Sequence, residues 1–173
     1  ASTSWGCGGY WLEGHTCYYF HEMWTPDEAT LVEENEMGIN FLELATVLFL
    51  LEASGSHFDG KSITLYCDND VSVEMLTSAK SRTAKMSALL EQIDSLVSKH
   101  NINIYFEWID TIQNKLADCL SRDSFETFKE EITKRYGACE YVQVVIDPHV
   151  RDIGEIVRET LGDLDSLEEV AGR

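Results

Sequence analysis

An acidic side chain follows a short apolar run in the first half of the chain. Residues 63–67 (ITLYC) are typical of a buried strand, and Asp68, Asn69 and Asp70 come directly after it. The carboxyl end of such a strand is where open α/β sheets place their chemistry. Asp is also a preferred helix N-cap, so Asp68 or Asp70 could simply cap the helix that follows.

A second carboxylate, Glu43, is the only charge in the apolar stretch 39–51, which predicts a buried central helix with Asn40 as its cap. Burying a lone carboxylate costs several kcal/mol unless it is paired, neutralised or bound to a metal. Glu43 therefore belongs either to a site or to a narrow solvated stripe near the helix start, where the helix dipole favours an acid.

A third acid, Asp118, lies in residues 114–122, which predict a short helix capped by Asn114. Leu116 and Leu120 are four residues apart and should face the core. Asp118 lies two residues from each and points the other way. By this geometry alone Asp118 is an ordinary exposed acid.

Hydrophobic periodicity predicts the elements that must hold these acids in place. Along the chain we expect a hairpin of residues 4–12 and 16–24, a third strand or a loop at 30–38, helices at 71–78 and 84–99, and a strand at 102–108. Beyond Arg122 we expect a helix at 125–136, a strand at 141–146 and a helix at 153–161. The length fits one domain, residues 1–122, with a C-terminal extension, residues 123–173, that ends in an acidic tail.

The charge balance opposes long-range attraction to nucleic acid. The formal net charge is −18, and part of the excess lies in the tail from Glu155 onward. One basic cluster interrupts this pattern, formed by Lys80, Arg82 and Lys85. It is either a solvated turn or a contact with a phosphate backbone.

Cysteine usage and hydropathy bear on the compartment. The five cysteines form no C-x-x-C pair, which favours buried free thiols in a reducing, intracellular setting, cytoplasmic or nuclear. No uninterrupted run of 18 apolar residues is present, so we expect no membrane partner. The sequence does not begin with Met and has the character of a piece of a larger protein.

Four segments, in order, resemble the ribonuclease H domain of retroelement reverse transcriptases. Residues 1–11 (ASTSWGCGGYW) resemble its first hairpin, residues 39–44 (INFLEL) its central helix and residues 66–69 (YCDN) its next catalytic strand. Residues 114–122 (NKLADCLSR) are similar to the N-x-x-A-D-x-L-S-R signature that closes the domain in gypsy-type and DIRS-type elements. The sequence of residues 39–44 is more similar to the DIRS type. The resemblance covers residues 1–122.

This resemblance implies an α/β ribonuclease H-like fold, with a mixed central sheet flanked by helices and an α/β C-terminal extension. It implies that Glu43, Asp68 and Asp118 are catalytic metal ligands for Mg²⁺ or Mn²⁺, two ions in all, and that the RNA strand of an RNA–DNA hybrid is cleaved. Carboxylate oxygens suit these hard cations. The expected partners are the hybrid and a polymerase domain in the same polypeptide, and the expected substrate-binding residues are Asn69, Asn114, Lys80, Arg82 and Lys85.

Two departures from the family pattern keep other functions open. The family's first strand begins with a catalytic Asp directly before the Ala-Ser step, whereas this sequence starts at Ala1. Trp108 stands where the family commonly has a His, and we expect His100 to be a surface residue at a helix end. The alternatives are an inactive ribonuclease H-like module with a structural or protein-binding role, and a DNA nuclease or integrase of the same superfold. The Asn-x-x-Ala-Asp signature argues against the latter.

Overall fold

The computed structural model describes all residues except 3, 27, 29–37, 82 and 153–173. Its elements, in chain order, are β1 (Gly6–Glu13), β2 (Thr16–Met23), α2 (Ile39–Ser54), η1 (Gly55–Phe58), β3 (Ser62–Cys67), α3 (Asp70–Ser78), α4 (Ala84–Lys99), β4 (Asn103–Trp108), α5 (Lys115–Ser121), α6 (Phe125–Tyr136), β5 (Glu140–Gln143) and α7 (Pro148–Arg151).

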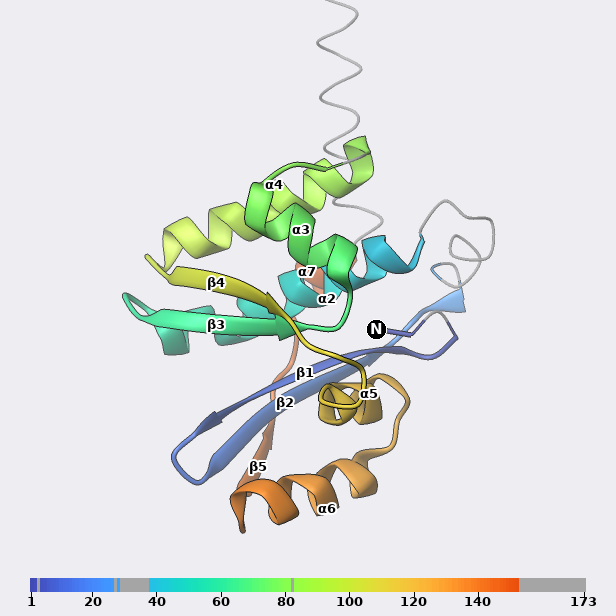
Figure 1. The fold of residues 1–173 in the computed structure, drawn as a ribbon, viewed down its shortest axis with the longest axis vertical. Helices are drawn as coiled ribbons and strands as arrows, with labels where there is room; N and C mark the ends of the chain where they lie inside the picture. Colours follow the sequence, from blue (N-terminus) through green and yellow to red (C-terminus); the bar gives the residue numbers. More distant parts are fainter. Residues whose placement is uncertain (3, 27, 29–37, 82, 153–173) are drawn as a thin grey trace, which may run out of the picture.

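The described strands form two sheets flanked by helices, which confirms the expected α/β class (Figure 1). The hairpin of β1 and β2 is antiparallel, and β5 joins it in parallel along β2, where Thr16 faces Glu140. Strands β3 and β4 pair in parallel from Ser62 and Asn103 to their carboxyl ends. The mixed sheet is therefore the three-stranded one, and hydrogen bonding among the described strands leaves β3 and β4 as a separate pair.

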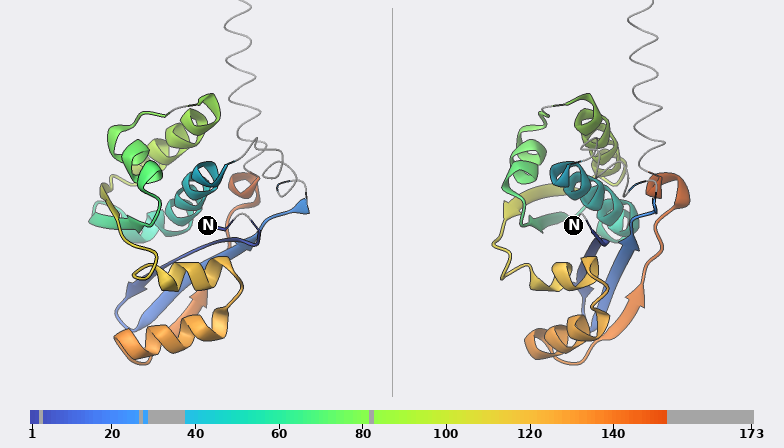
Figure 2. Two further views of the ribbon diagram at one scale, coloured as in Figure 1. Left: turned by 45° about the vertical axis from the view of Figure 1, so that its right-hand side comes forward. Right: turned by 90° about the vertical axis from the view of Figure 1, so that its right-hand side faces the viewer.

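Helix α2 is the centre of the larger core, because it is apolar nearly all round. It lies between the hairpin sheet and the layer of α3 and α4, as Figures 1 and 2 show. Leu42, Leu44 and Phe49 have no exposed surface. By length and composition alone residues 39–58 could cross a membrane, but 67% of the most apolar window is buried inside the fold, as expected for a core helix.

A second, smaller core lies on the opposite face of the hairpin. Helices α5 and α6 cover this face (Figure 2), and Leu116 of α5 packs there with Phe128 and Ile132 of α6. All three side chains are fully buried. Burial of side chains of this size stabilises the fold by about 1.5–3 kcal/mol each, so α6 contributes directly to the stability of the hairpin layer.

The chain after β5 returns to the first core. Arg151 of α7 donates from Nε to Glu22 Oε2 at 3.1 Å and from Nη1 to Glu28 Oε1 at 2.5 Å. Its guanidinium also lies over the rings of Trp24 and Phe49. This contact and the two cores tie residues 125–151 to the hairpin and to α2.

Most expected elements are present, with corrections at their ends. The bounds of α4 and α6 are those predicted, 84–99 and 125–136, and α2 continues to Ser54. Asn40 was wrongly expected to cap α2, because the cap position is Gly38 and Asn40 lies inside the helix. Asn114 does occupy the cap position of α5, but its side chain makes no capping hydrogen bond.

Other expectations concern the chain ends and the thiols. The possible third strand at 30–38, apart from Gly38, and the helix at 153–161 lie outside the described residues. Helix α7 was not expected. All five cysteines are free, and four of them are buried, as the sequence predicted. His100 does end a helix, α4, but only 15% of its side chain is exposed, because it packs on Gly55 and pairs with Asp59.

Candidate metal centre

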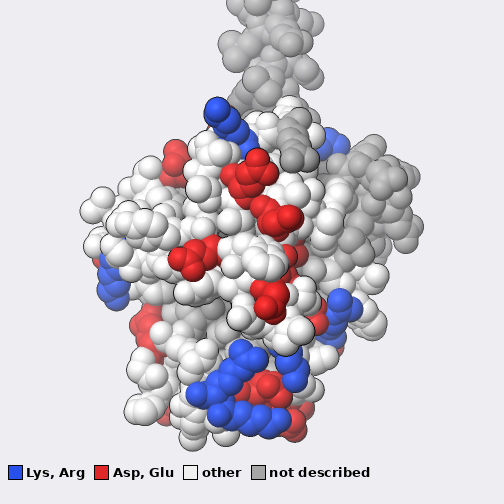
Figure 3. All heavy atoms as spheres, in the orientation of Figure 1, with Lys and Arg blue, Asp and Glu red and all other residues white. Residues whose placement is uncertain are grey.

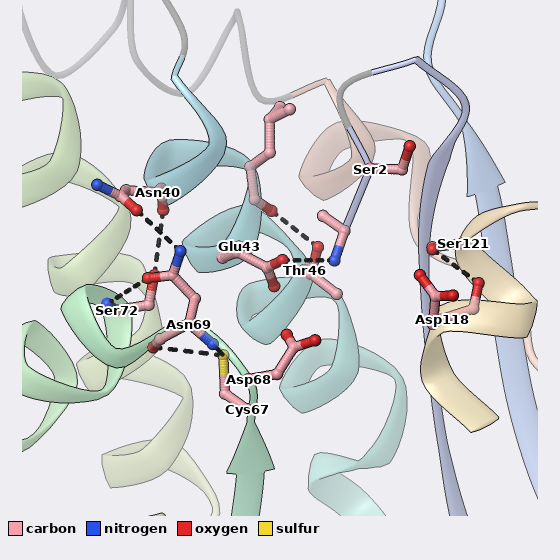
Figure 4. A network of polar contacts seen from close by, with 12 residues as sticks. Ser2, Asn40, Glu43, Thr46, Cys67, Asp68, Asn69, Ser72, Asp118 and Ser121 are labelled. Atoms are coloured by element: carbon pink, nitrogen blue, oxygen red, sulfur yellow. Dashed lines mark hydrogen bonds and ion pairs between the residues drawn. The ribbon is translucent and has the colours of Figure 1, made fainter. Parts of the chain in front are cut away.

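The acids Glu43 and Asp68 converge at the carboxyl end of β3. Ligand atoms of Glu43, Asp68 and Cys67 all lie within 4.8 Å of one another. Figure 4 shows the carboxylates of Glu43 and Asp68 on facing elements, one on α2 and the other just past β3. The convergence exists because α2 crosses the end of this strand with its Glu43 face turned inward.

Backbone and side-chain contacts hold the end of β3 in place. Ile109 N donates to the Cys67 carbonyl oxygen at 3.0 Å, which continues the strand pairing past β4. The indole Nε1 of Trp108 donates to the carbonyl oxygen of Asp68 at 3.2 Å. The position of Asp68 therefore depends on β4 as well as on its own strand.

The residue after Asp68 links the two helices that border the site. Asn69 caps α3, since its Oδ1 accepts from Ser72 N at 2.8 Å. Its Nδ2 donates to Asn40 Oδ1 on α2, also at 2.8 Å. Asn69, rather than Asp68 or Asp70, is thus the cap, which leaves the Asp68 carboxylate free of that role.

Glu43 is a carboxylate in a dry environment, with 7% of the residue exposed. Its Oε1 lies 2.6 Å from the ammonium nitrogen of Ala1. Burial raises the pKa of the Glu43 carboxyl above its ordinary value and outweighs the opposing effect of the ammonium. The negative charges of Asp68 and Asp118 raise the pKa of Glu43 further. A divalent cation at this point would offset both the cost of burying the Glu43 charge and the repulsion between the acids.

Cys67 is a neighbour of the acids that the sequence motifs did not predict as a site residue. Burial, with the nearby Glu43 charge, raises the pKa of its thiol to about 11, so the thiol is protonated at neutral pH. Its place directly before Asp68 was the available signal. A thiol is a soft ligand and does not suit Mg²⁺.

Asp118 lies apart from the other two acids. It is on α5, across from Asp68 in Figure 4, and its Oδ1 accepts from Arg122 Nε at 2.8 Å. Its side chain is 36% exposed, and it is not one of the three residues whose ligand atoms lie within 4.8 Å of one another. The structure therefore brings two of the three predicted acids together and holds the third in an ion pair.

A cavity of about 320 Å³ opens beside Glu43, between β1 and β3. Strands β1 and β3 and helix α2 form its walls, and Asn114, Ala117 and Tyr136 close one side. Asn114 therefore faces the space next to the acids, whereas the amide of Asn69 is occupied by its two internal hydrogen bonds.

The predicted basic cluster lies at the far end of α3. Helix α3 starts beside Asp68 and runs nine residues before Lys80, a separation of roughly 13 Å along the axis. Lys80 is exposed and Lys85 is partly buried in the first turn of α4. Arg82 lies outside the described residues. Contact of this cluster with substrate stays a prediction.

The donor set can be compared with the metal expected from the sequence. Two hard carboxylates, Glu43 and Asp68, fit one divalent cation such as Mg²⁺ or Mn²⁺. A second ion would need Asp118 to exchange Arg122 for the metal.

Part of the chain matches a known family. Residues 57–124 match the model of a family described as reverse transcriptase-like, which is a ribonuclease H-like family. The match runs from η1 to just past α5 and includes Asp68 and Asp118, while Glu43 precedes it. No curated protein and no solved structure matches the chain. The match and the α/β architecture are consistent with a ribonuclease H-like fold, and neither distinguishes gypsy-type from DIRS-type elements.

Proposed function

We propose that this chain is a nuclease domain that hydrolyses the RNA strand of RNA–DNA hybrids within a retroelement reverse transcriptase. The convergence of Glu43 and Asp68 at the end of β3 carries this proposal. The family match over residues 57–124 supports it. We also propose a polymerase domain in the same polypeptide, as the sequence resemblance implies, and an intracellular location, for which free cysteines argue.

The proposed roles follow from where each side chain lies. Glu43 and Asp68 would hold a divalent cation, and Asp118 would join them once it leaves Arg122. A metal in such a site supplies an activated water and stabilises the leaving oxygen. Glu43 is buried at the edge of the cavity, and Asn114, which lines the same cavity, would contact the substrate.

The surroundings of Ala1 suggest how the site is completed. Because its nitrogen lies 2.6 Å from Glu43 Oε1, a residue attached before Ala1 would enter the space beside the acids. The family pattern puts an Asp at that position. We therefore propose that an Asp there would be a further ligand.

The test is cleavage of a labelled RNA–DNA hybrid in Mg²⁺ or Mn²⁺ by this chain and by a version with Asp before Ala1. We expect Asp68→Asn to abolish cleavage in the active form and to leave the fold intact. Metal should also raise Tm, because it binds only the folded site, and the rise should vanish in the Asp68→Asn variant. Cleavage by Asp68→Asn at the unaltered rate would overturn the assignment.

One observation favours a second function, an inactive ribonuclease H-like module for structure or protein interaction. Asp118, the acid of the closing motif, is held by Arg122 at 2.8 Å and stands outside the close group of ligand atoms. If neither version of the chain cleaves hybrid and metal leaves Tm unchanged, this second function replaces the first.

A further inference from the structure

Besides the cluster at residues 80–85, a second stretch of this acidic chain is rich in positive charge. Residues 114–136 contain five of its 13 lysines and arginines. The same stretch has five acids, so it is neutral in a chain whose net charge is −18. Figure 3 shows lysines and arginines gathered over α5 and α6, while acids dominate the face above them. The α5–α6 region should therefore repel phosphate less than the chain does on average.

Four of these cations form a surface, which we call the α5–α6 basic surface. All four are exposed, and they are Lys115, Arg122, Lys134 and Arg135. The fifth, Lys129, lies over the ring of Phe125 and pairs with Glu126, so it is not included.

The basic surface adjoins the candidate metal centre. Lys115 and Arg122 flank Asp118 on and just after α5. Tyr136, directly after Arg135, lines the same cavity as Glu43 and Asn114. The last turn of α6 thus runs from the cations to the rim of the cavity, and the ring of Tyr136 remains 51% exposed there.

Two of these cations, Lys115 and Lys134, are incompletely neutralised. Lys115 and Lys134 share one carboxylate oxygen, Glu131 Oε1, at 3.1 Å each. One negative charge cannot neutralise two positive ones. Ion pairs made by exposed lysines are weak in water, so a phosphate can compete for either lysine.

We propose that the α5–α6 basic surface binds the sugar–phosphate backbone of the nucleic-acid duplex and holds it over the cavity beside Glu43. This inference rests on the proposed function and assigns a role to α6, which lies beyond the residues that carry the sequence motifs. Cations spaced over two helices bind backbone phosphates without reading sequence. The surface accordingly serves duplexes of any sequence.

The test measures binding of a fluorescent RNA–DNA hybrid by anisotropy in EDTA, where no cleavage occurs, between 50 and 200 mM salt. The variant Lys134→Ala/Arg135→Ala removes two cations of the surface. The matched control is Lys61→Ala/Lys99→Ala. Lys61 directly precedes β3 and Lys99 ends α4, whereas the candidate metal centre is at the carboxyl end of β3. Tm of each variant is measured as well, because cations in the last turn of α6 also stabilise this helix by their interaction with its dipole.

We expect the slope of log affinity against log salt to fall by about 1 for each cation removed from the surface, and to change less in the control. Between 50 and 200 mM salt, the variant that lacks two phosphate contacts should therefore lose roughly tenfold less affinity than the unaltered chain loses. Equal slopes for the two double variants would overturn the inference, as would absence of hybrid binding by the unaltered chain.

The two proposals fail separately. If the surface variant shows the reduced slope but no form of the chain cleaves hybrid, the duplex-binding surface stands and the nuclease does not. If cleavage depends on Asp68 but the surface variant keeps the full slope, the nuclease stands and the duplex lies elsewhere.

Discussion

Trp108 supports Asp68 through the backbone: its indole Nε1 donates to the Asp68 carbonyl oxygen at 3.2 Å. Trp108 ends β4 and Asp68 directly follows β3, so this bond holds the ends of the two parallel strands together at the candidate metal centre. The Trp108 indole therefore contacts the backbone of a residue whose side chain is one of the candidate metal ligands.

Trp108→Phe should clearly lower the rate of hybrid cleavage, while it lowers the free energy of unfolding only slightly. The ring is 55% exposed, so its replacement loses little packing, and one lost hydrogen bond costs about 0.5–1.5 kcal/mol. Cleavage rate and urea unfolding would be compared with Tyr105→Phe, an equally exposed change on the same strand. Equal cleavage by the two variants would mean that the bond does not position Asp68.

Gly8 should tolerate no side chain, because β1 passes directly against α5. A Cβ at Gly8 would lie 2.3 Å from Leu120 Cβ, so Gly8→Ala must push α5 outward and with it Asp118. We expect a loss of about 1–3 kcal/mol in the free energy of unfolding. Gly38→Ala is the control, since its Cβ would meet nothing within 4 Å. A Gly8→Ala protein as stable as the control would contradict the close approach.

Ile132→Ala should destabilise the hairpin layer although Ile132 lies after the last sequence motif. Its side chain is fully buried against the second core, so the change should cost about 2–5 kcal/mol. The exposed neighbour change Thr133→Ala should stay within about 0.5 kcal/mol. Both are measured by urea unfolding.

The domain boundary that the sequence predicts after Arg122 can be tested by truncation. A chain that ends at Arg122 would lack Phe128 and Ile132 and leave Tyr19 of the hairpin uncovered. We expect it to unfold at lower urea than the full chain. A truncated chain of unchanged stability would mean that α6 is only an appendage.

Thiol reagents should modify Cys139 before the other four cysteines in the folded protein. Cys139 is the one that is not buried. Burial raises the pKa of Cys7 and Cys17 to about 12 and that of Cys67 to about 11, and the reactive form is the thiolate. Brief alkylation followed by mass spectrometry would show the order. Early labelling of Cys67 would mean that the end of β3 opens in solution.

The sequence by itself determined most helices and strands, including the three elements on or beside which Glu43, Asp68 and Asp118 lie. Periodicity placed α4 at its observed bounds, because a core-facing stripe repeats every three to four residues whatever it packs against, and Gly137 marked the end of α6. The lone charge in the apolar stretch 39–51 pointed to Glu43, and the run before Asp68 predicted β3. These signals are local and need no knowledge of the fold.

Only the tertiary structure decided which side chains meet. Cys67 joins the acids because α2 crosses the end of β3, and Asp118 stands aside because Arg122, one helical turn on, takes its carboxylate. Asn69 caps α3 through a local bond from Ser72, but only the fold brings its amide to Asn40, which lies 29 residues earlier. The pairing of β5 with β2 and the place of α6 beside the cavity follow from burial of Phe128 and Ile132 against the hairpin, a contact between segments more than 100 residues apart that no local pattern encodes.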